Sequence, residues 1–175
     1  GSSTWPASPG TADETTWSYH EGSGLLTNKT DAANKSVSYT YSAGNRLATR
    51  MWARSGGLTT SYSYSDAGNL TGIDYSDSTP DVTFTHDRLG RQKTAESSVS
   101  THTFAYDGLF LDTETIVRDG ITNVIDHSHD SYGRNAGFTL GANYSVSYAY
   151  DIYGRFSSVS SSVPSVASVV QYSYL

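Results

Sequence analysis

The sequence predicts an all-β fold of tandem antiparallel β-hairpins that form a continuous curled or spiralling sheet. Three observations support this prediction: a composition rich in Tyr, Ser and Thr, a repeat of about 22 residues, and Gly or Asn at regular turn positions. Hydrophobic residues make up 36% of the 175 residues, and Tyr alone occurs 14 times. Aromatic and β-branched residues favour strands over helices, so the composition agrees with the repeat.

The repeat is clearest in the segment 148–156, which reads YAYDIYGRF. It contains an aromatic residue, a spacer, a second aromatic residue, Asp, two variable residues, Gly, Arg and an apolar residue. Copies recur at intervals of 20–24 residues. They are centred on Tyr19, Tyr41, Tyr64, His86, Tyr106, His129, Tyr150 and Tyr174. So narrow a spread over eight copies indicates one structural unit per repeat.

Two aromatic positions in each repeat are separated by one residue, which places both side chains on the same face of a strand. Next to Tyr39, Tyr41, Tyr62 and Tyr64, the residues Ser38, Thr40 and Ser63 face the other way. The sequence therefore predicts two-faced strands with a structural ladder of aromatic side chains. These repeat aromatics are Tyr39, Tyr41, Tyr62, Tyr64, Phe84, His86, Phe104, Tyr106, His127, His129, Tyr148, Tyr150, Tyr172 and Tyr174.

A tight turn follows the second aromatic residue of each repeat. An Asp side chain at the start of a turn accepts backbone N–H groups, and Gly or Asn further on tolerates a positive φ. His20 takes the place of the turn Asp in the first copy. The predicted turn residues are Asp87, Asp107, Asp130 and Asp151, with Asn45, Gly68, Gly90, Gly133 and Gly154.

After each tight turn, apolar and polar residues alternate again, as in 46–50 and 69–75, which indicates a returning strand. A second cluster of turn-forming residues then reverses the chain. Each repeat is thus an up strand, a turn, a down strand and a turn. No segment keeps a helical spacing of apolar residues for three turns. We expect residues 1–14 to be an irregular lead-in or a tag remnant. Residues 15–175 are expected to form seven to eight repeats, truncated at the C-terminus.

Charge and composition exclude several partners. The formal net charge of −6 leaves no basic patch for a phosphate backbone, so we expect no nucleic-acid partner. The absence of Cys excludes disulfides and thiolate metal sites. No apolar stretch approaches the length of a membrane-spanning helix, so no membrane span is predicted.

The motif Tyr-x-Tyr-Asp-x-x-Gly-Arg-Leu, at this period, resembles the signature of the Rhs/YD-repeat family over residues 15–175. The family includes bacterial Rhs proteins, the B and C components of Tc toxins, and animal teneurins. The resemblance implies a β-sheet that spirals into a hollow shell, which in the toxins encloses a C-terminal effector. It also implies a secreted or bacterial cell-surface location, with adjacent repeats and an enclosed effector as partners. Ser42 and Ser65 depart from the motif, as does the copy at Asp107, which lacks a clear Gly-Arg.

Two groups of residues have the composition of a chemical site. His127 and His129, two apart on one strand face, have the spacing of a metal-ligand pair, but both occupy aromatic positions of the repeat. The recurring Asp residues suggest catalytic or calcium-binding carboxylates, yet an enzyme needs one assembled site rather than one acid per repeat. We therefore expect no catalytic residue, no metal site and no cofactor.

Carbohydrate binding is the main alternative function, because aromatic side chains stack on sugar rings. Trp52 is the preferred candidate for ligand contact, since it is not repeated and lies beside the turn at Ser55. Cross-strand ladders explain the repeated Tyr residues more simply. The sequence thus favours a scaffold, the wall of a larger encapsulating shell, over a cell-surface carbohydrate-binding or adhesion module.

The turn assignment predicts how substitutions of Gly154 affect stability. Gly154→Val should cost about 1–2 kcal/mol or more, because a β-branched residue is strained at positive φ, whereas Gly154→Asn should cost much less. Urea unfolding of the two variants and the unsubstituted chain checks this. Equal destabilisation by Val and Asn would show that the turn is assigned wrongly.

Overall fold

The computed structural model describes residues 14–54, 56–163 and 166–174. Residues 1–13, most of the predicted lead-in, lie outside this part. The chain divides into two units, one ending at Val82 and the other beginning at Thr83. Within the described residues every regular element is a β-strand and no helix occurs, so none is long and apolar enough to cross a membrane. The predicted all-β class is confirmed.

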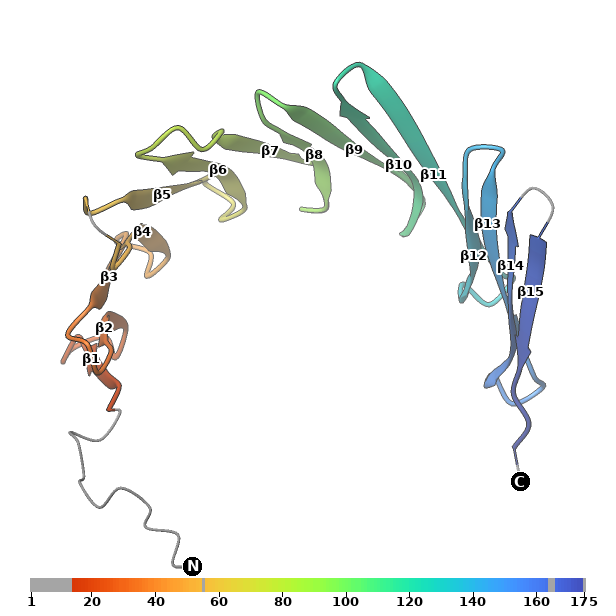
Figure 1. The fold of residues 1–175 in the computed structure, drawn as a ribbon, viewed down its shortest axis with the longest axis horizontal. Helices are drawn as coiled ribbons and strands as arrows, with labels where there is room; N and C mark the ends of the chain where they lie inside the picture. Colours follow the sequence, from red (N-terminus) through yellow and green to blue (C-terminus); the bar gives the residue numbers. More distant parts are fainter. Residues whose placement is uncertain (1–13, 55, 164–165, 175) are drawn as a thin grey trace, which may run out of the picture. The chain divides into compact units, whose positions relative to one another are not determined.

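In the first unit six strands follow one another across the sheet in chain order, each antiparallel to the next (Figure 1). The strands are β1 (Thr16–Tyr19), β2 (Leu26–Thr30), β3 (Ser36–Tyr41), β4 (Leu47–Met51), β5 (Thr59–Tyr64) and β6 (Leu70–Tyr75).

The second unit has the same topology, with nine strands in chain order (Figure 1). The strands are β7 (Val82–His86), β8 (Gln92–Glu96), β9 (Ser100–Asp107), β10 (Phe110–Arg118), β11 (Ile121–His129), β12 (Asn135–Leu140), β13 (Tyr144–Tyr150), β14 (Phe156–Val163) and β15 (Val166–Gln171). The predicted tandem antiparallel hairpins are therefore present in both units.

The second aromatic residue of each repeat marks a β-bulge. The register of β3 against β4 shifts between Thr40 and Tyr41, and the same shift precedes Tyr64, His86 and Tyr150. A bulge adds one residue to the returning strand and increases its twist. The repeat thus specifies where each hairpin bends as well as where it turns.

Each unit is a single layer of strands with little interior. None of the described hydrophobic side chains is fully buried, and the most deeply buried polar residue is Thr60, which is 3% exposed. Alternate residues are half-buried and exposed, as in β7 and β13. Contacts along and between strands must therefore supply stability that a two-layer domain obtains from its core.

Gly137 is the glycine of the second unit at which an added Cβ would come closest to the backbone of a neighbouring strand. It lies in β12 with a φ of 143°, and a Cβ built on it would lie 2.1 Å from the carbonyl oxygen of Val146 on β13. Backbone cannot move aside as a flexible side chain can, so only Gly fits this position.

Gly137→Ala is therefore expected to destabilise the protein by about 2 kcal/mol or more, through steric overlap with β13 added to backbone strain. Gly141→Ala is the matched control, because Gly141 also has a positive φ but a Cβ there would meet no atom within 4 Å. Thermal or urea unfolding measures both. Similar costs for the two variants would contradict the close approach.

Candidate functional site

The most elaborate polar arrangement in the chain is the tight turn that begins at Asp87. One carboxylate oxygen, Oδ1, accepts the backbone N–H groups of Leu89 and Arg91 at 2.8 and 3.0 Å. The other oxygen, Oδ2, accepts Nε and Nη2 of the Arg91 guanidinium, both at 2.7 Å. Asp87 thus organises the turn backbone and holds Arg91 in a bidentate, charge-assisted pair.

The same turn occurs twice more in the second unit. Asp130 pairs with Arg134 at 2.7 Å from both Nε and Nη2, and Asp151 pairs with Arg155 at 2.8 Å from both atoms. Each Asp also accepts the backbone N–H groups two and four residues on. The backbone closes as a type I-like turn followed by a residue at positive φ. The residues with positive φ at this position are Asn45, Gly68, Gly90, Gly133 and Gly154.

These contacts change the acidity of the three carboxyl groups. Partial desolvation by itself raises the pKa of Asp87, but hydrogen bonds from the Arg91 side chain and from the backbone of Arg91 and Leu89 outweigh it, so the pKa lies below its ordinary value. The pKa values of Asp130 and Asp151 are lowered by the same balance of desolvation against hydrogen bonds from the turn. All three Asp residues favour the charged form in the folded protein.

Each turn Arg also contacts the following hairpin. The Arg91 guanidinium carbon lies 4.0 Å from the centroid of the Tyr106 ring, and its Nη1 donates to the Gly108 carbonyl at 2.6 Å. The Tyr106 hydroxyl in turn donates to the carbonyl of Gln92, the residue after Arg91, at 2.9 Å. We call this set of turn Asp, turn Arg and next-repeat Tyr the turn clamp.

Two further turn clamps have matching geometry. Arg134 lies 4.2 Å from the Tyr150 ring centroid, and Arg155 lies 4.1 Å from that of Tyr174. The Tyr150 and Tyr174 hydroxyls donate at 2.8 Å to the carbonyls of the residues that follow the two arginines. A guanidinium over an aromatic face is attracted by the ring, so each clamp couples one hairpin to the next.

The first unit has looser versions of this arrangement. Ser42 replaces the turn Asp, and its Oγ accepts the backbone N–H of Arg46 at 3.4 Å. Without a carboxylate to hold it, Arg46 lies 5.8 Å from the Tyr64 ring centroid. His20, predicted to replace Asp in the first copy, accepts the Ser23 backbone N–H through Nδ1 at 3.1 Å. The turn is kept there while the charged pair is lost.

Asp107 is a correction to the sequence prediction. It lies inside β9 opposite Phe110, and the chain reverses through the two residues Gly108 and Leu109, with Gly108 at a φ of 55°. This shorter loop has no room for the Asp-initiated turn, so Asp107 is not the turn acceptor expected. The Gly108 carbonyl instead accepts Arg91 of the preceding turn.

His127 and His129 do not converge on one point. His127 Nε2 lies 2.7 Å from Glu114 Oε1, and His102 Nε2 lies 3.0 Å from Glu114 Oε2, whereas the His129 ring stacks on Phe110 at 4.7 Å. Glu114 thus links β9, β10 and β11. Among the described residues no group of three His, Cys, Asp or Glu side chains is arranged to hold a metal ion.

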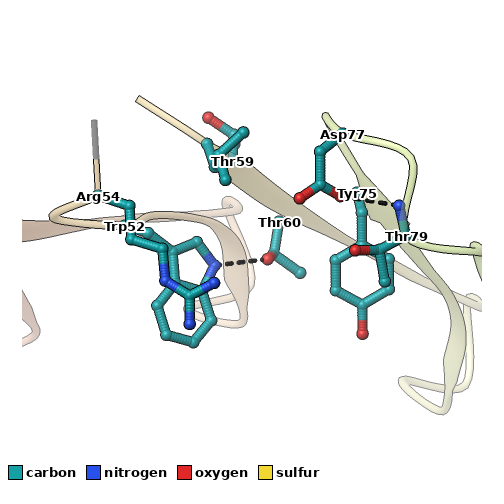
Figure 2. Close-up of a pocket in the computed structure, with 8 residues that line it drawn as sticks. Trp52, Arg54, Thr59, Thr60, Tyr75, Asp77 and Thr79 are labelled. Carbon is teal, nitrogen blue, oxygen red and sulfur yellow. Dashed lines mark hydrogen bonds between the residues drawn. The ribbon is translucent and has the colours of Figure 1, made fainter. Parts of the chain in front are cut away.

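Trp52 is less accessible than the sequence suggested. Figure 2 shows it beside Thr60, whose Oγ1 accepts the Trp52 Nε1–H at 2.9 Å. The guanidinium of Arg50 lies 3.6 Å from its ring centroid and that of Arg54 lies 5.4 Å away. Trp52 lines a cavity, whose other lining residues are Arg54, Leu58, Thr59, Thr60, Tyr75, Asp77 and Thr79. The ring is already occupied by two cationic side chains, which disfavours it as a platform for a sugar.

The other predicted aromatics line one half-buried face of the strands. Tyr39, Tyr62, Phe84, Phe104 and Tyr148 occupy the first aromatic position and are neither fully buried nor fully exposed. Tyr148 and Tyr150 both contact Phe156 across the hairpin, at ring-centroid distances of 5.8 and 4.9 Å. Tyr172 and Tyr174 lie just beyond β15 and are about half exposed.

The topology and the clamps define the class of protein: an antiparallel β-hairpin repeat protein with successive hairpins coupled at their turns. Residues 19–55 match the family model described as RHS Repeat. No curated protein matches the chain. The matched segment contains the first two copies of the recurring motif, centred on Tyr19 and Tyr41.

The similar solved structures include two whose titles name the same pair of proteins. One, titled "Crystal Structure of TcdB2-TccC3-Cdc42", matches with a TM-score of 0.76 and 13% sequence identity, over 90% of this chain and 10% of the solved chain. The other, "Crystal Structure of TcdB2-TccC3", covers the same shares at 18% identity with a TM-score of 0.46. The chain spans about a tenth of the length of either. At these identities the first match establishes the shared fold.

The lowered pKa values of Asp87, Asp130 and Asp151 predict an acid-dependent loss of stability. A carboxyl group whose pKa is lower in the folded state stabilises the protein fully above its unfolded value, here 3.8, and loses that contribution as the pH falls further. Urea midpoints should therefore fall more steeply between about pH 5 and about pH 2.5 in the unsubstituted chain than in the triple variant Asp87→Asn, Asp130→Asn, Asp151→Asn. Parallel slopes would rule out the turn carboxylates as the cause.

Proposed function

We propose that this chain is a section of the wall of a larger encapsulating β-shell, in a secreted or surface-displayed protein of the Rhs type. The observation that carries the proposal is the turn clamp. Each clamp connects one hairpin to the next through Arg91, Arg134 or Arg155, which is the contact a continuous wall needs. The partners in this proposal are adjacent repeats and an enclosed C-terminal effector.

A structural role also accounts for how the charged groups are used. Both oxygens of Asp87 are committed to its own turn, and the Arg91 guanidinium is shared between that turn and the next hairpin. The same holds for the turns at Asp130 and Asp151. Side chains whose polar atoms are bonded to one another stabilise a structure. A catalytic acid or base instead needs a polar atom that is free to face a substrate. We therefore propose a scaffold rather than an enzyme.

Carbohydrate binding remains the alternative from the sequence, but its preferred residue is poorly placed. Trp52 donates its Nε1–H to Thr60 and carries the guanidinium of Arg50 against its ring. The wall proposal needs no ligand at this position. A glycan array probed with the chain and with Trp52→Ala separates the two functions, since saturable binding lost in the variant would support adhesion.

The wall function is tested directly by building the chain into a recombinant Rhs-type shell in place of the structurally matching segment. A reporter enclosed by the chimera should resist an added protease. The variant Arg91→Gln, Arg134→Gln, Arg155→Gln should leak, because the coupling between hairpins is weakened at three turns. Protease resistance of the reporter over time is the measurement.

A matched control is Arg88→Gln, Arg118→Gln and Lys93→Gln, three exposed cations outside the clamps. It changes the net charge equally and should leave protection intact. A chimera that assembles at the correct size yet leaves the reporter as exposed as the free reporter would refute the wall function.

A further inference from the structure

A cationic cavity lies on the first unit. It is formed on the face of β2, β3 and β4 that carries the repeat aromatics. The register places Lys29 opposite Val37 and Tyr39 opposite Arg50, so alternate residues of the three strands gather at one place. The residues that line the cavity are Lys29, Asp31, Lys35, Val37, Tyr39, Arg50 and Ala53.

The charges around this cavity oppose the charge of the whole chain. Lys29, Lys35 and Arg50 contribute three positive charges and Asp31 one negative charge, which leaves a formal excess of two positive charges. The chain as a whole carries −6. A local excess of this sign on an acidic protein attracts small anions to one position rather than to the surface at large.

Arg50 is the residue that most needs a counterion. Its guanidinium carbon lies 3.6 Å from the centroid of the Trp52 ring, and its Nε is buried without a hydrogen-bond partner among the described residues. No described carboxylate lies within ion-pair distance of it. A buried donor left without an acceptor costs free energy, so such groups in native proteins usually bind water, an ion or a ligand.

Asp31 does not supply that counterion, because it is engaged in its own turn. Its Oδ1 accepts the backbone N–H groups of Ala33 and Lys35, both at 2.9 Å. This turn has the same form as the Asp87 turn, with Asn34 at a φ of 57° in the position of Gly90. Lys35 stands where the clamp has Arg and makes no side-chain ion pair within the described part of the chain.

We propose that this cavity is an oxyanion-binding site that takes a phosphate or carboxylate group. A guanidinium is planar and carries its N–H groups at its edge, where their spacing matches two oxygens of such an anion. The ammonium groups of Lys29 and Lys35 add positive charges that can pair with an anion from many directions. The bound group would pair with the Arg50 guanidinium and neutralise the excess charge. The site is independent of the wall function.

Titration with sodium phosphate at constant ionic strength, followed by ¹H–¹⁵N NMR, tests the site. The Arg50 Nε–H signal and the backbone amides of Lys35 and Val37 should shift together along one saturable curve. Arg50→Gln should weaken binding about tenfold or more, since a charged hydrogen bond is lost. Lys93→Gln, an equal change of charge on β8, should leave the dissociation constant unchanged.

Asp31→Asn sharpens the test, because Asn keeps the Oδ1 acceptor of the turn while removing the only negative charge from the cavity. The variant should bind phosphate more tightly than the unsubstituted chain. Weaker binding in this variant would mean that Asp31 assists the anion and would overturn the proposed charge balance.

A parallel titration with sodium acetate distinguishes the two sources of the oxyanion. Tighter binding of phosphate would indicate a phosphate group, and tighter binding of acetate would indicate the carboxylate of an acidic polypeptide. Linear, non-saturating shifts that are equal in the unsubstituted chain and in Arg50→Gln would overturn the proposal.

Discussion

The structure depends on an arginine that serves two hairpins at once. In the second unit the guanidinium of Arg91 is held by Asp87 in its own turn and lies over Tyr106 of the next hairpin. Because each unit is one layer of strands with no fully buried hydrophobic side chain in the described residues, no shared core links neighbouring hairpins. Neighbouring hairpins are linked by backbone ladders, by side-chain pairs along the strands and, at their turns, by the recurring turn clamp.

The carboxylate makes this contact effective. An isolated exposed cation over an aromatic ring contributes little, because the long side chain must be ordered first. Asp87 lowers this ordering cost, because its carboxylate already holds the Arg91 guanidinium in the position in which it contacts Tyr106. The first unit shows the converse, because Ser42 cannot hold Arg46. The Arg46 guanidinium lies 5.8 Å from the Tyr64 ring centroid, whereas that of Arg91 lies 4.0 Å from the Tyr106 ring centroid. The turn at Ser42 closes without Asp, so the Asp of the repeat governs the coupling between hairpins rather than the turn itself.

Much of this fold follows from local sequence signals. The alternation of aromatic and small polar residues indicates strands, and the Asp-x-x-Gly spacing indicates the turn, because both depend on residues within a few positions of one another. The partner of Arg155 is not local: Tyr174 lies in the following repeat, and only the register of the strands brings the two together. Glu114 between His102 and His127 is unpredictable for the same reason. The prediction for Asp107 was wrong because its loop is one residue shorter than the loop at Asp87: Tyr106 pairs with Leu111, whereas His86 pairs with Gln92.

A double-mutant cycle on Arg91 and Tyr106 tests the central claim most directly. Arg91→Gln, Tyr106→Leu and the double variant give a coupling free energy in which the loss of the Asp87 pair cancels, since it is common to the single and double Arg variants. The account predicts a coupling of about 1 kcal/mol for this pair, and a smaller one for the looser pair Arg46 and Tyr64. A coupling of zero between Arg91 and Tyr106, or equal coupling in the two pairs, would contradict it.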